Sequence, residues 1–238
     1  MKQYLNISMT VLLGMFLLSA CKKEATEKEE EPGTIKISLT KAADAGGDWT
    51  LYLDAASADR PEIWADINNN RVKDNGESIA NFGTGNANRF SPGSSKTIGL
   101  YGRVTIFHCH DNELTALDVS KSTALVELYC LGNRLTTLDL SKNTALQKLS
   151  CFGNKLTTLD LSGNTNIRSV QLYGNQISAA NMTQLINSLP ARQAADDARL
   201  YVRQASDNNS LPTATDIATA KTKNWKLYAV EGNDWKAL

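Results

Sequence analysis

The sequence has little of what a catalytic, nucleic-acid-binding or membrane-spanning protein needs. Histidine occurs only twice in 238 residues, at His108 and His110. Basic and acidic side chains number 25 each, so no net field attracts nucleic acid or anionic lipid. No stretch approaches the roughly 20 apolar residues that a membrane-spanning helix requires. These absences argue against nucleic-acid partners and exclude a transmembrane helix.

The first 20 residues have the layout of a secretory signal. Lys2 is followed by an apolar stretch that is too short to span a bilayer. The tetrad Leu-Ser-Ala-Cys, which ends at Cys21, resembles a bacterial lipobox. That resemblance implies that Cys21 is lipidated and becomes the N-terminus, whereas cleavage elsewhere of an ordinary signal peptide is the alternative. Removal of residues 1–20 from the 238 would leave 218 residues anchored to a membrane by lipid.

A charged segment follows this cysteine. Residues 22–31, KKEATEKEEE, contain three Lys, five Glu and no aromatic residue. Such a segment buries too little apolar surface to offset the entropy of ordering, so residues 21–33 are predicted to form a flexible tether. The segment resembles the acidic export signals of some Gram-negative lipoproteins. It therefore implies a surface-exposed protein of the bacterial outer membrane, with a plain spacer facing the periplasm as the alternative.

An internal repeat with a fixed period of 21 residues dominates the chain. Residues 113–135, 134–156 and 155–177 align column by column. Each contains an apolar-x-apolar step of period two, which predicts a short strand with two side chains pointing inward. One repeat cannot close a core, but a stack can, so we predict a solenoid of parallel strands over residues 104–178. The first inward columns are Val104, Leu125, Leu146 and Ile167, then Phe107, Leu128, Leu149 and Val170.

The repeat reads LxxLxCxxNxL and resembles the 21-residue leucine-rich repeats of internalin-like bacterial proteins, including the subset with a stacked cysteine ladder. Cys109, Cys130 and Cys151 share the inward column that Leu172 occupies in the next repeat. We therefore predict buried, unpaired thiols that act as small hydrophobic side chains. Disulfide formation or metal binding is the weaker alternative.

Two polar columns accompany the apolar ones. Asparagines at the bend are predicted to bond backbone groups that leave the sheet ladder. Aspartates on the convex side are predicted to accept backbone N–H bonds, with a cation site as the weaker interpretation. The first column is Asn112, Asn133, Asn154 and Asn175, and the second is Asp118, Asp139 and Asp160.

The segments on either side of the repeats lack the period. Residues 34–103 contain four strand-like runs and predict a small β domain that caps the first repeat. Residues 179–238 predict two strand-helix units that cap the other end. The expected fold is mainly β with some α. The expected C-terminal elements are helices around residues 182–189 and 213–225 and strands at 199–203 and 226–230.

An Asp- and Asn-rich loop lies within the N-terminal segment. Its oxygen-bearing residues have the spacing of a calcium-binding loop, and Ca²⁺ is the only cofactor that the sequence suggests. Arg71 occupies the position where an EF-hand needs glycine, and the flanks look like strands. The sequence therefore predicts a calcium-binding loop by its ligand spacing but does not predict an EF-hand. A plain Asx-rich hairpin loop without calcium is an equal alternative. The candidate ligands are Asp66, Asn68, Asn70, the Val72 carbonyl, Asp74 and Glu77.

Side chains between the inward strand positions are predicted to line the concave face of the solenoid. Exposed aromatic rings on a rigid sheet are typical anchors for a peptide or sugar. Both histidines join them and flank Cys109, pointing away from its thiol, so no Cys-His nucleophile forms. The candidate binding residues are His108, His110, Tyr129, Leu131, Phe152, Gln171 and Tyr173.

These features together predict a non-enzymatic binding protein. We expect a monomeric, lipid-anchored protein of the cell envelope that binds a protein, peptide or glycan through the concave face. A structural or adhesive spacer without a specific small ligand is the alternative.

Overall fold

The computed structural model describes residues 36–91, 95–204, 207–231 and 234–238. The predicted signal peptide, Cys21 and the tether lie outside these residues. Gly33–Leu238 is one compact unit. In the part of the chain that the structure describes, no helix is both long and apolar enough to cross a membrane.

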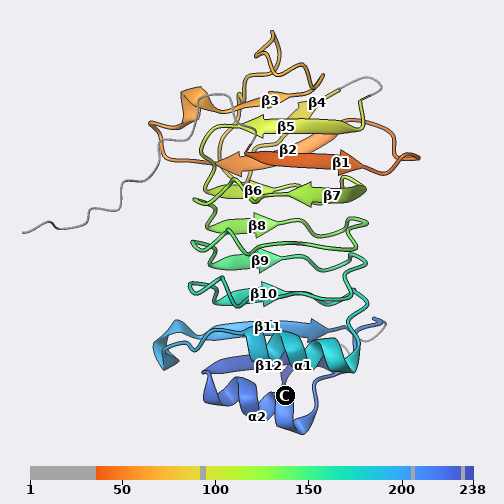
Figure 1. The fold of residues 1–238 in the computed structure, drawn as a ribbon, viewed down its shortest axis with the longest axis vertical. Helices are drawn as coiled ribbons and strands as arrows, with labels where there is room; N and C mark the ends of the chain where they lie inside the picture. The colour runs from red at the N-terminus through yellow and green to blue at the C-terminus, as the bar shows by residue number, and fades with distance from the viewer. Residues whose placement is uncertain (1–35, 92–94, 205–206, 232–233) are drawn as a thin grey trace, which may run out of the picture. The chain divides into compact units, whose positions relative to one another are not determined.

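Four short parallel strands form the centre of the stack (Figure 1). Residues 21 apart in the sequence are paired in register, for example Phe107 with Leu128 and Leu128 with Leu149. This register confirms the predicted leucine-rich-repeat fold with parallel strands. The four strands are β6 (Ile106–His108), β8 (Glu127–Tyr129), β9 (Lys148–Ser150) and β10 (Ser169–Gln171).

The inward columns fill one continuous core. The predicted apolar residues of the repeats are buried together with the residues of both flanking segments. Cys109, Cys130 and Cys151 are fully buried and unpaired, which confirms that the thiols act as core side chains. Burial raises the pKa of the Cys130 thiol to about 12, so the ladder stays protonated at neutral pH.

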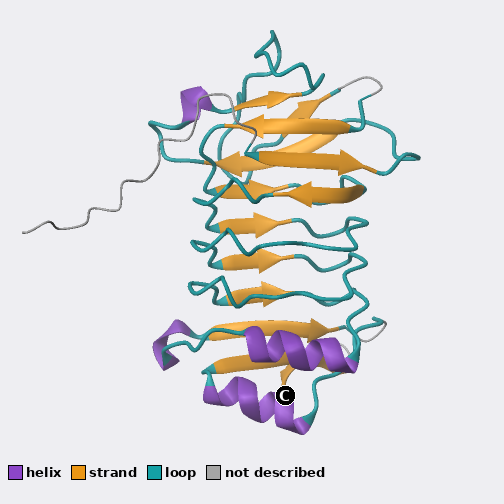
Figure 2. Cartoon of the chain, viewed as in Figure 1, coloured by secondary structure: helices purple, strands orange, loops and turns teal. Residues whose placement is uncertain are grey.

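Two strand-helix units extend the sheet at the C-terminal end, as the sequence predicts (Figure 2). Ser178 caps the first helix and Thr213 caps the second, each accepting a backbone N–H bond in the first turn. A last strand, which was not predicted, turns back antiparallel to β12. The elements are α1 (Ala179–Ser188), η2 (Ala194–Asp196), β11 (Ala198–Arg203), α2 (Ala214–Thr222), β12 (Trp225–Glu231) and β13 (Asp234–Ala237).

The N-terminal strands divide between two sheets. One part extends the repeat sheet, where β2 pairs antiparallel with β6 and β4 follows β2. The other part forms a four-stranded sheet in the order β3-β5-β1-β7, so both exposed edges of the first repeat are paired. The elements are β1 (Ile37–Lys41), β2 (Trp49–Asp54), η1 (Arg60–Glu62), β3 (Trp64–Asp66), β4 (Asn88–Phe90), β5 (Thr97–Tyr101) and β7 (Leu114–Asp118).

The asparagine column satisfies the buried backbone at each bend. The side-chain amide of Asn133 donates to the carbonyls of Cys109 and Cys130 at 3.0 Å each. Its oxygen accepts the N–H groups of Asn112 and Leu114 at 3.1 and 2.9 Å. One side chain therefore bonds two successive repeats, as predicted for this column.

The convex aspartates also have the predicted role. Asp139 accepts the N–H of Ser141 at 2.8 Å, and Asp160 accepts that of Ser162 at the same distance. These bonds lower the pKa of Asp139. The column therefore stabilises turns.

Candidate ligand-binding face

The side chains that point away from the core along the nine-stranded sheet form what we call the open sheet face. It corresponds to the predicted concave face. Strand register places its side chains in rows that run across the repeats. The middle row is Tyr52, His108, Tyr129, Ser150, Gln171, Tyr201 and Tyr228.

Three predicted aromatic residues lie on this face. Tyr129, Phe152 and Tyr173 are each partly exposed. The rings of Phe152 and Tyr173 stack with centroids 4.4 Å apart and planes 12° apart. Partial burial raises the pKa of the Tyr173 hydroxyl. The two stacked rings form a rigid apolar surface that remains open on one side.

His108 holds Tyr129 in place and offers little surface of its own. Its ring stacks on Tyr129 at 4.2 Å, and its Nε2 lies 3.1 Å from Glu127 Oε1. Only 6% of the residue is exposed. Burial lowers the pKa of His108, and this effect outweighs the opposing effect of Glu127. Glu127 also pairs with Lys148 on the adjacent strand at 3.1 Å.

The remaining predicted residues lie close to these rings. His110 stacks on Tyr52 at 5.2 Å, and its Nδ1 is 3.1 Å from Asp111 Oδ2. Leu131 is partly exposed. The Ser150 hydroxyl lies 3.1 Å from Gln171 Oε1, which orients the amide of Gln171. The residues that the sequence predicted for this face therefore lie on neighbouring strands and form one continuous surface.

The face also contains aromatic residues that sequence reasoning missed. Tyr201 and Tyr228 stack at 5.0 Å on neighbouring strands. Trp235 reaches back from β13 and lies 5.0 Å from Tyr201 and 5.1 Å from Tyr173. The alternation within the predicted strands at 199–203 and 226–230 was a sufficient signal for both tyrosines. Trp235 had none, because β13 has no repeat and only four residues.

Glycines directly follow Leu131, Phe152 and Tyr173, and the backbone conformation requires them there. Gly132, Gly153 and Gly174 have φ angles of 64°, 65° and 67°, a region that L-residues with side chains rarely adopt. A Cβ on Gly174 would also lie 3.1 Å from the backbone nitrogen of Gly153. The glycines are thus required by the turn, and they also leave the edges of the neighbouring rings uncovered.

The Asp- and Asn-rich loop uses its oxygens to organise itself. The buried Asp66 accepts the N–H groups of Asn70 and Arg71 at 3.0 and 2.9 Å. The buried Glu77 accepts those of Ile67 and Asp74 at 2.9 and 2.8 Å. Arg71 has a φ of 64°, which is the conformation that glycine supplies at this position of an EF-hand.

The other candidate calcium ligands lie in the same loop. The side-chain amides of Asn68 and Asn70 donate to Asp74 Oδ2 at 2.9 and 2.7 Å, and this lowers the pKa of Asp74. Val72 lies at the exposed tip. Within residues 36–91 and the other described ranges, no three histidine, cysteine or acidic side chains are grouped closely enough to hold a metal. Calcium binding therefore stays a prediction.

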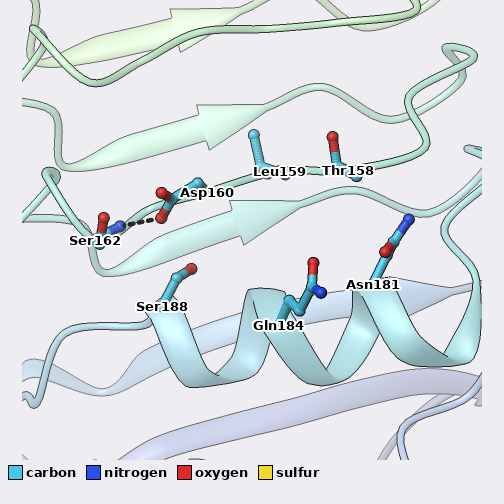
Figure 3. A pocket seen from close by; sticks show the side chains of 7 residues that line it. All are labelled: Thr158, Leu159, Asp160, Ser162, Asn181, Gln184 and Ser188. Atoms are coloured by element: carbon cyan, nitrogen blue, oxygen red, sulfur yellow. Dashed lines mark hydrogen bonds between the residues drawn. The ribbon is translucent and has the colours of Figure 1, made fainter.

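A cavity of about 370 Å³ lies on the side of the stack opposite the open sheet face, between the third repeat and α1 (Figure 3). Most of its lining residues are polar in type, among them Asp160 and Gln184. The carboxylate of Asp160 is already bonded to Ser162. Ser188 is likewise occupied, because its hydroxyl accepts the N–H of Leu161 and donates to Leu185. Two of the lining side chains thus already bond the backbone around the cavity.

Comparison with known proteins finds two solved structures that are similar over about half of this chain. No protein-family model matches, and a search of curated proteins found no match. An internalin (InlF) from Listeria monocytogenes is similar at 21% identity and a TM-score of 0.40, over 53% of this chain and 35% of that one. The functional domain of InlJ from the same organism, which includes a cysteine ladder, is similar at 23% identity and a TM-score of 0.36, over 54% of this chain and 32% of that one.

The chain thus spans about a third of the length of either solved structure. At these identities the likeness concerns the fold alone. The register of the parallel strands and the buried cysteine and asparagine columns carry the assignment independently. The chain folds as a leucine-rich-repeat stack.

Proposed function

We propose that this protein is a ligand-binding leucine-rich-repeat protein of the cell envelope. Its open sheet face would recognise a protein, peptide or glycan. The observation that supports this most is the set of partly exposed rings at Tyr129, Phe152 and Tyr173, which point away from the core on a sheet fixed by ladders. We propose no catalytic role.

Rigidity favours binding on this face. The rings of Phe152 and Tyr173 are stacked on each other, and Tyr129 is stacked on His108. Their rotamers are therefore restricted before a ligand arrives, which reduces the entropy lost on association. Large aromatic side chains in such positions often supply most of the binding energy of an interface.

The lipid anchor is a separate part of the proposal. It rests on the lipobox-like tetrad at Cys21 and on the acidic segment behind it. The anchor would hold the protein on the bacterial outer membrane, with residues 34–103 and 179–238 capping the repeats. Labelling of cells with a radioactive fatty acid should mark the parent and leave a Cys21→Ala variant unmarked, and protease shaving of intact cells should distinguish surface display from a periplasmic location.

Binding by the open sheet face is tested by a triple variant. After a ligand has been found on glycan and peptide arrays, Tyr129, Phe152 and Tyr173 are changed together to Ser. We expect at least a tenfold loss of affinity in a variant that keeps the circular dichroism spectrum of the parent. Val72→Ser removes a 59% exposed apolar side chain at the tip of the Asp- and Asn-rich loop and is the matched control.

Either of two results would refute the proposal. One is a folded triple variant that binds as tightly as the parent. The other is an absence of saturable binding to any array member, which is the behaviour expected of a structural spacer.

A further inference from the structure

The C-terminal end of the open sheet face differs in charge from the rest of that face. Arg199 and Lys226 face each other on β11 and β12, and both pair with the single carboxylate of Asp197. Their side chains remain 46% and 60% exposed. Arg203 lies on the same face of β11 and is partly exposed. This end therefore carries more cationic than anionic groups.

Nearby carboxylates do not cancel this excess. Asp207 accepts the N–H groups of Gly174 and Gln204 at 2.6 and 3.0 Å, so backbone groups of the third repeat and of its own loop hold its carboxylate in place. With Asp197 it makes two anions against the three cations Arg199, Arg203 and Lys226. Asp234 precedes Trp235 on β13, and alternation along the strand turns it toward the opposite side. By contrast, the charge of Lys148 in the central repeats is balanced by Glu127.

Aromatic rings border these cations. Tyr201 and Tyr228 lie two residues beyond Arg199 and Lys226 on the same strands, and their rings are stacked. Trp235 stands at 85° to Tyr201 with centroids 5.0 Å apart, and 39% of it is exposed. The two rings are in edge-to-face contact and form a corner that stays partly exposed.

We propose that this corner and its cations bind a glycan that carries carboxylate groups, such as uronic or sialic acid residues. This inference rests on the proposed function and names the ligand class for the C-terminal end of the same face. A pyranose ring has an apolar C–H face that stacks on an aromatic ring and hydroxyls at its rim that bond to polar side chains. The guanidinium of Arg199 supplies planar donors that match a carboxylate.

An acidic peptide fits this end less well. Peptides that bind sheets usually add a strand at a free edge, which at this end is β13. The strand that carries Arg199 and Tyr201 is β11, and it is paired on both sides, with β10 and β12. The backbone groups of β11 are therefore used within the sheet. Recognition here falls to side chains and flat ring faces, which suits the hydroxyl-rich and ring-shaped units of a glycan.

The test is an array of carboxylated oligosaccharides, each beside its own methyl ester, with poly-glutamate as the peptide probe. The purified full chain should prefer at least one free acid over its ester by tenfold or more, and this preference should shrink as salt is raised. Arg199→Gln combined with Lys226→Gln should abolish the preference and keep the weaker binding of the ester. Trp235→Ala should weaken both forms, and Lys148→Gln should change neither.

Several results would overturn the inference. These are equal binding of acids and esters, binding of poly-glutamate as tight as that of the best glycan, or an unchanged preference in the double variant. Binding of no carboxylated array member would also overturn it. A neutral or peptide ligand that still depends on Tyr129, Phe152 and Tyr173 would leave the proposed function intact, so the two proposals can fail separately.

Discussion

The central repeats and the two ends of the stack meet the same bonding requirement with different residues. In the centre, asparagines 21 residues apart bond the backbone of successive repeats. At the N-terminal end, Asn112 bonds both the N–H and the carbonyl of Thr50 on an antiparallel strand. At the C-terminal end, Asn209 bonds Leu172, Val202 and Ile177. An asparagine bonds the buried backbone along the whole stack, although the 21-residue spacing holds only in the central repeats.

The ends differ from the centre in a second way. Along the central strands the charges are paired and the rings come from the repeat itself. The Asp- and Asn-rich loop, the unbalanced cations at Arg199 and Lys226 and the ring of Trp235 all lie in the segments without a period. Because the end segments do not have to keep the 21-residue period, they can contain loops and side chains that do not fit the repeats.

The largest effect is expected from the asparagine column. Asn133→Ala leaves three buried backbone groups without their side-chain partner, namely two N–H groups and the Cys109 carbonyl, because the Cys130 carbonyl keeps its bond from Asn154. This should cost about 4 kcal/mol of unfolding free energy. Asn209→Ala at the end of the stack leaves two, the Ile177 N–H and the Val202 carbonyl, because Asn175 still bonds the Leu172 carbonyl; it should cost somewhat less. Urea unfolding measures both.

Asn166→Ala is the matched control, because that side chain is exposed and makes one bond, to the Thr144 carbonyl. It should cost less than about 1 kcal/mol. Equal losses for Asn133→Ala and Asn166→Ala would show that the column is not a structural ladder.

The next effect concerns the cysteines, which occur in three central repeats and are replaced by Leu172 toward the C-terminal end. Cys130→Ser places a hydroxyl in an apolar column and should cost about 1–3 kcal/mol. Native protein should resist a bulky thiol reagent and react only on unfolding. Rapid labelling of two or more native thiols would contradict this account.

The same thiols predict alkaline sensitivity. Burial raises the pKa of Cys130 to about 12 in the folded state, well above the pKa of an exposed thiol. As pH rises, the unfolded chain therefore loses its thiol protons before the folded protein does. The contribution of the protonated Cys130 to the free energy of unfolding should be complete below about pH 9 and fall as pH rises toward 12. A Cys130→Ala variant, measured by urea unfolding at several pH values, should show a shallower decline than the parent, and an identical decline would contradict the raised pKa.

A smaller effect is expected at the Asp- and Asn-rich loop. With an affinity on the order of 10⁻⁴ to 10⁻³ M, about 5 mM Ca²⁺ should add roughly 1–2 kcal/mol and raise the melting temperature relative to chelator. Glu77→Gln should remove this response, while Asp59→Asn, outside the loop, should keep it. A melting curve of the parent that Ca²⁺ leaves unmoved would remove calcium from the account.

The smallest effect is expected at His108, where the N-terminal strands meet the repeats. Its pKa is lowered by burial, so the unfolded state takes up a proton first as pH falls. The contribution of the neutral ring is present above the unfolded pKa of about 6.5 and is lost as pH falls below it. His108→Gln should therefore flatten the stability profile slightly between pH 7 and 5, and a matched His110→Gln variant should change it less.

The sequence predicted the central part of the fold closely because spacing alone determines register there. A 21-residue period placed Phe107, Leu128 and Leu149 in one paired row. The sequence did not predict the second buried amide column, in which Asn143 and Asn164 donate to the convex carbonyls, because asparagine is common in exposed turns as well and its type alone does not indicate burial. The sequence also missed β4, β7 and β13, which are short and gain their pairing only from tertiary contacts.

Part of the candidate site could likewise be predicted from the sequence, and part could not. Tyr129, Phe152 and Tyr173 follow from strand alternation. The near-complete burial of His108 does not, because it depends on Tyr129 and Glu127 on the next strand. The position of Trp235 over the sheet depends on a hairpin that no sequence pattern marked.

The central claim, that the open sheet face binds the ligand, is tested most directly by hydroxyl-radical footprinting of the unmodified protein with and without its array ligand. The account predicts that ligand reduces oxidation of Tyr129, Phe152 and Tyr173 and leaves Val72 unchanged. Unchanged oxidation of these three rings, with protection appearing instead at the Asp- and Asn-rich loop or beside the cavity at Asp160, would contradict it.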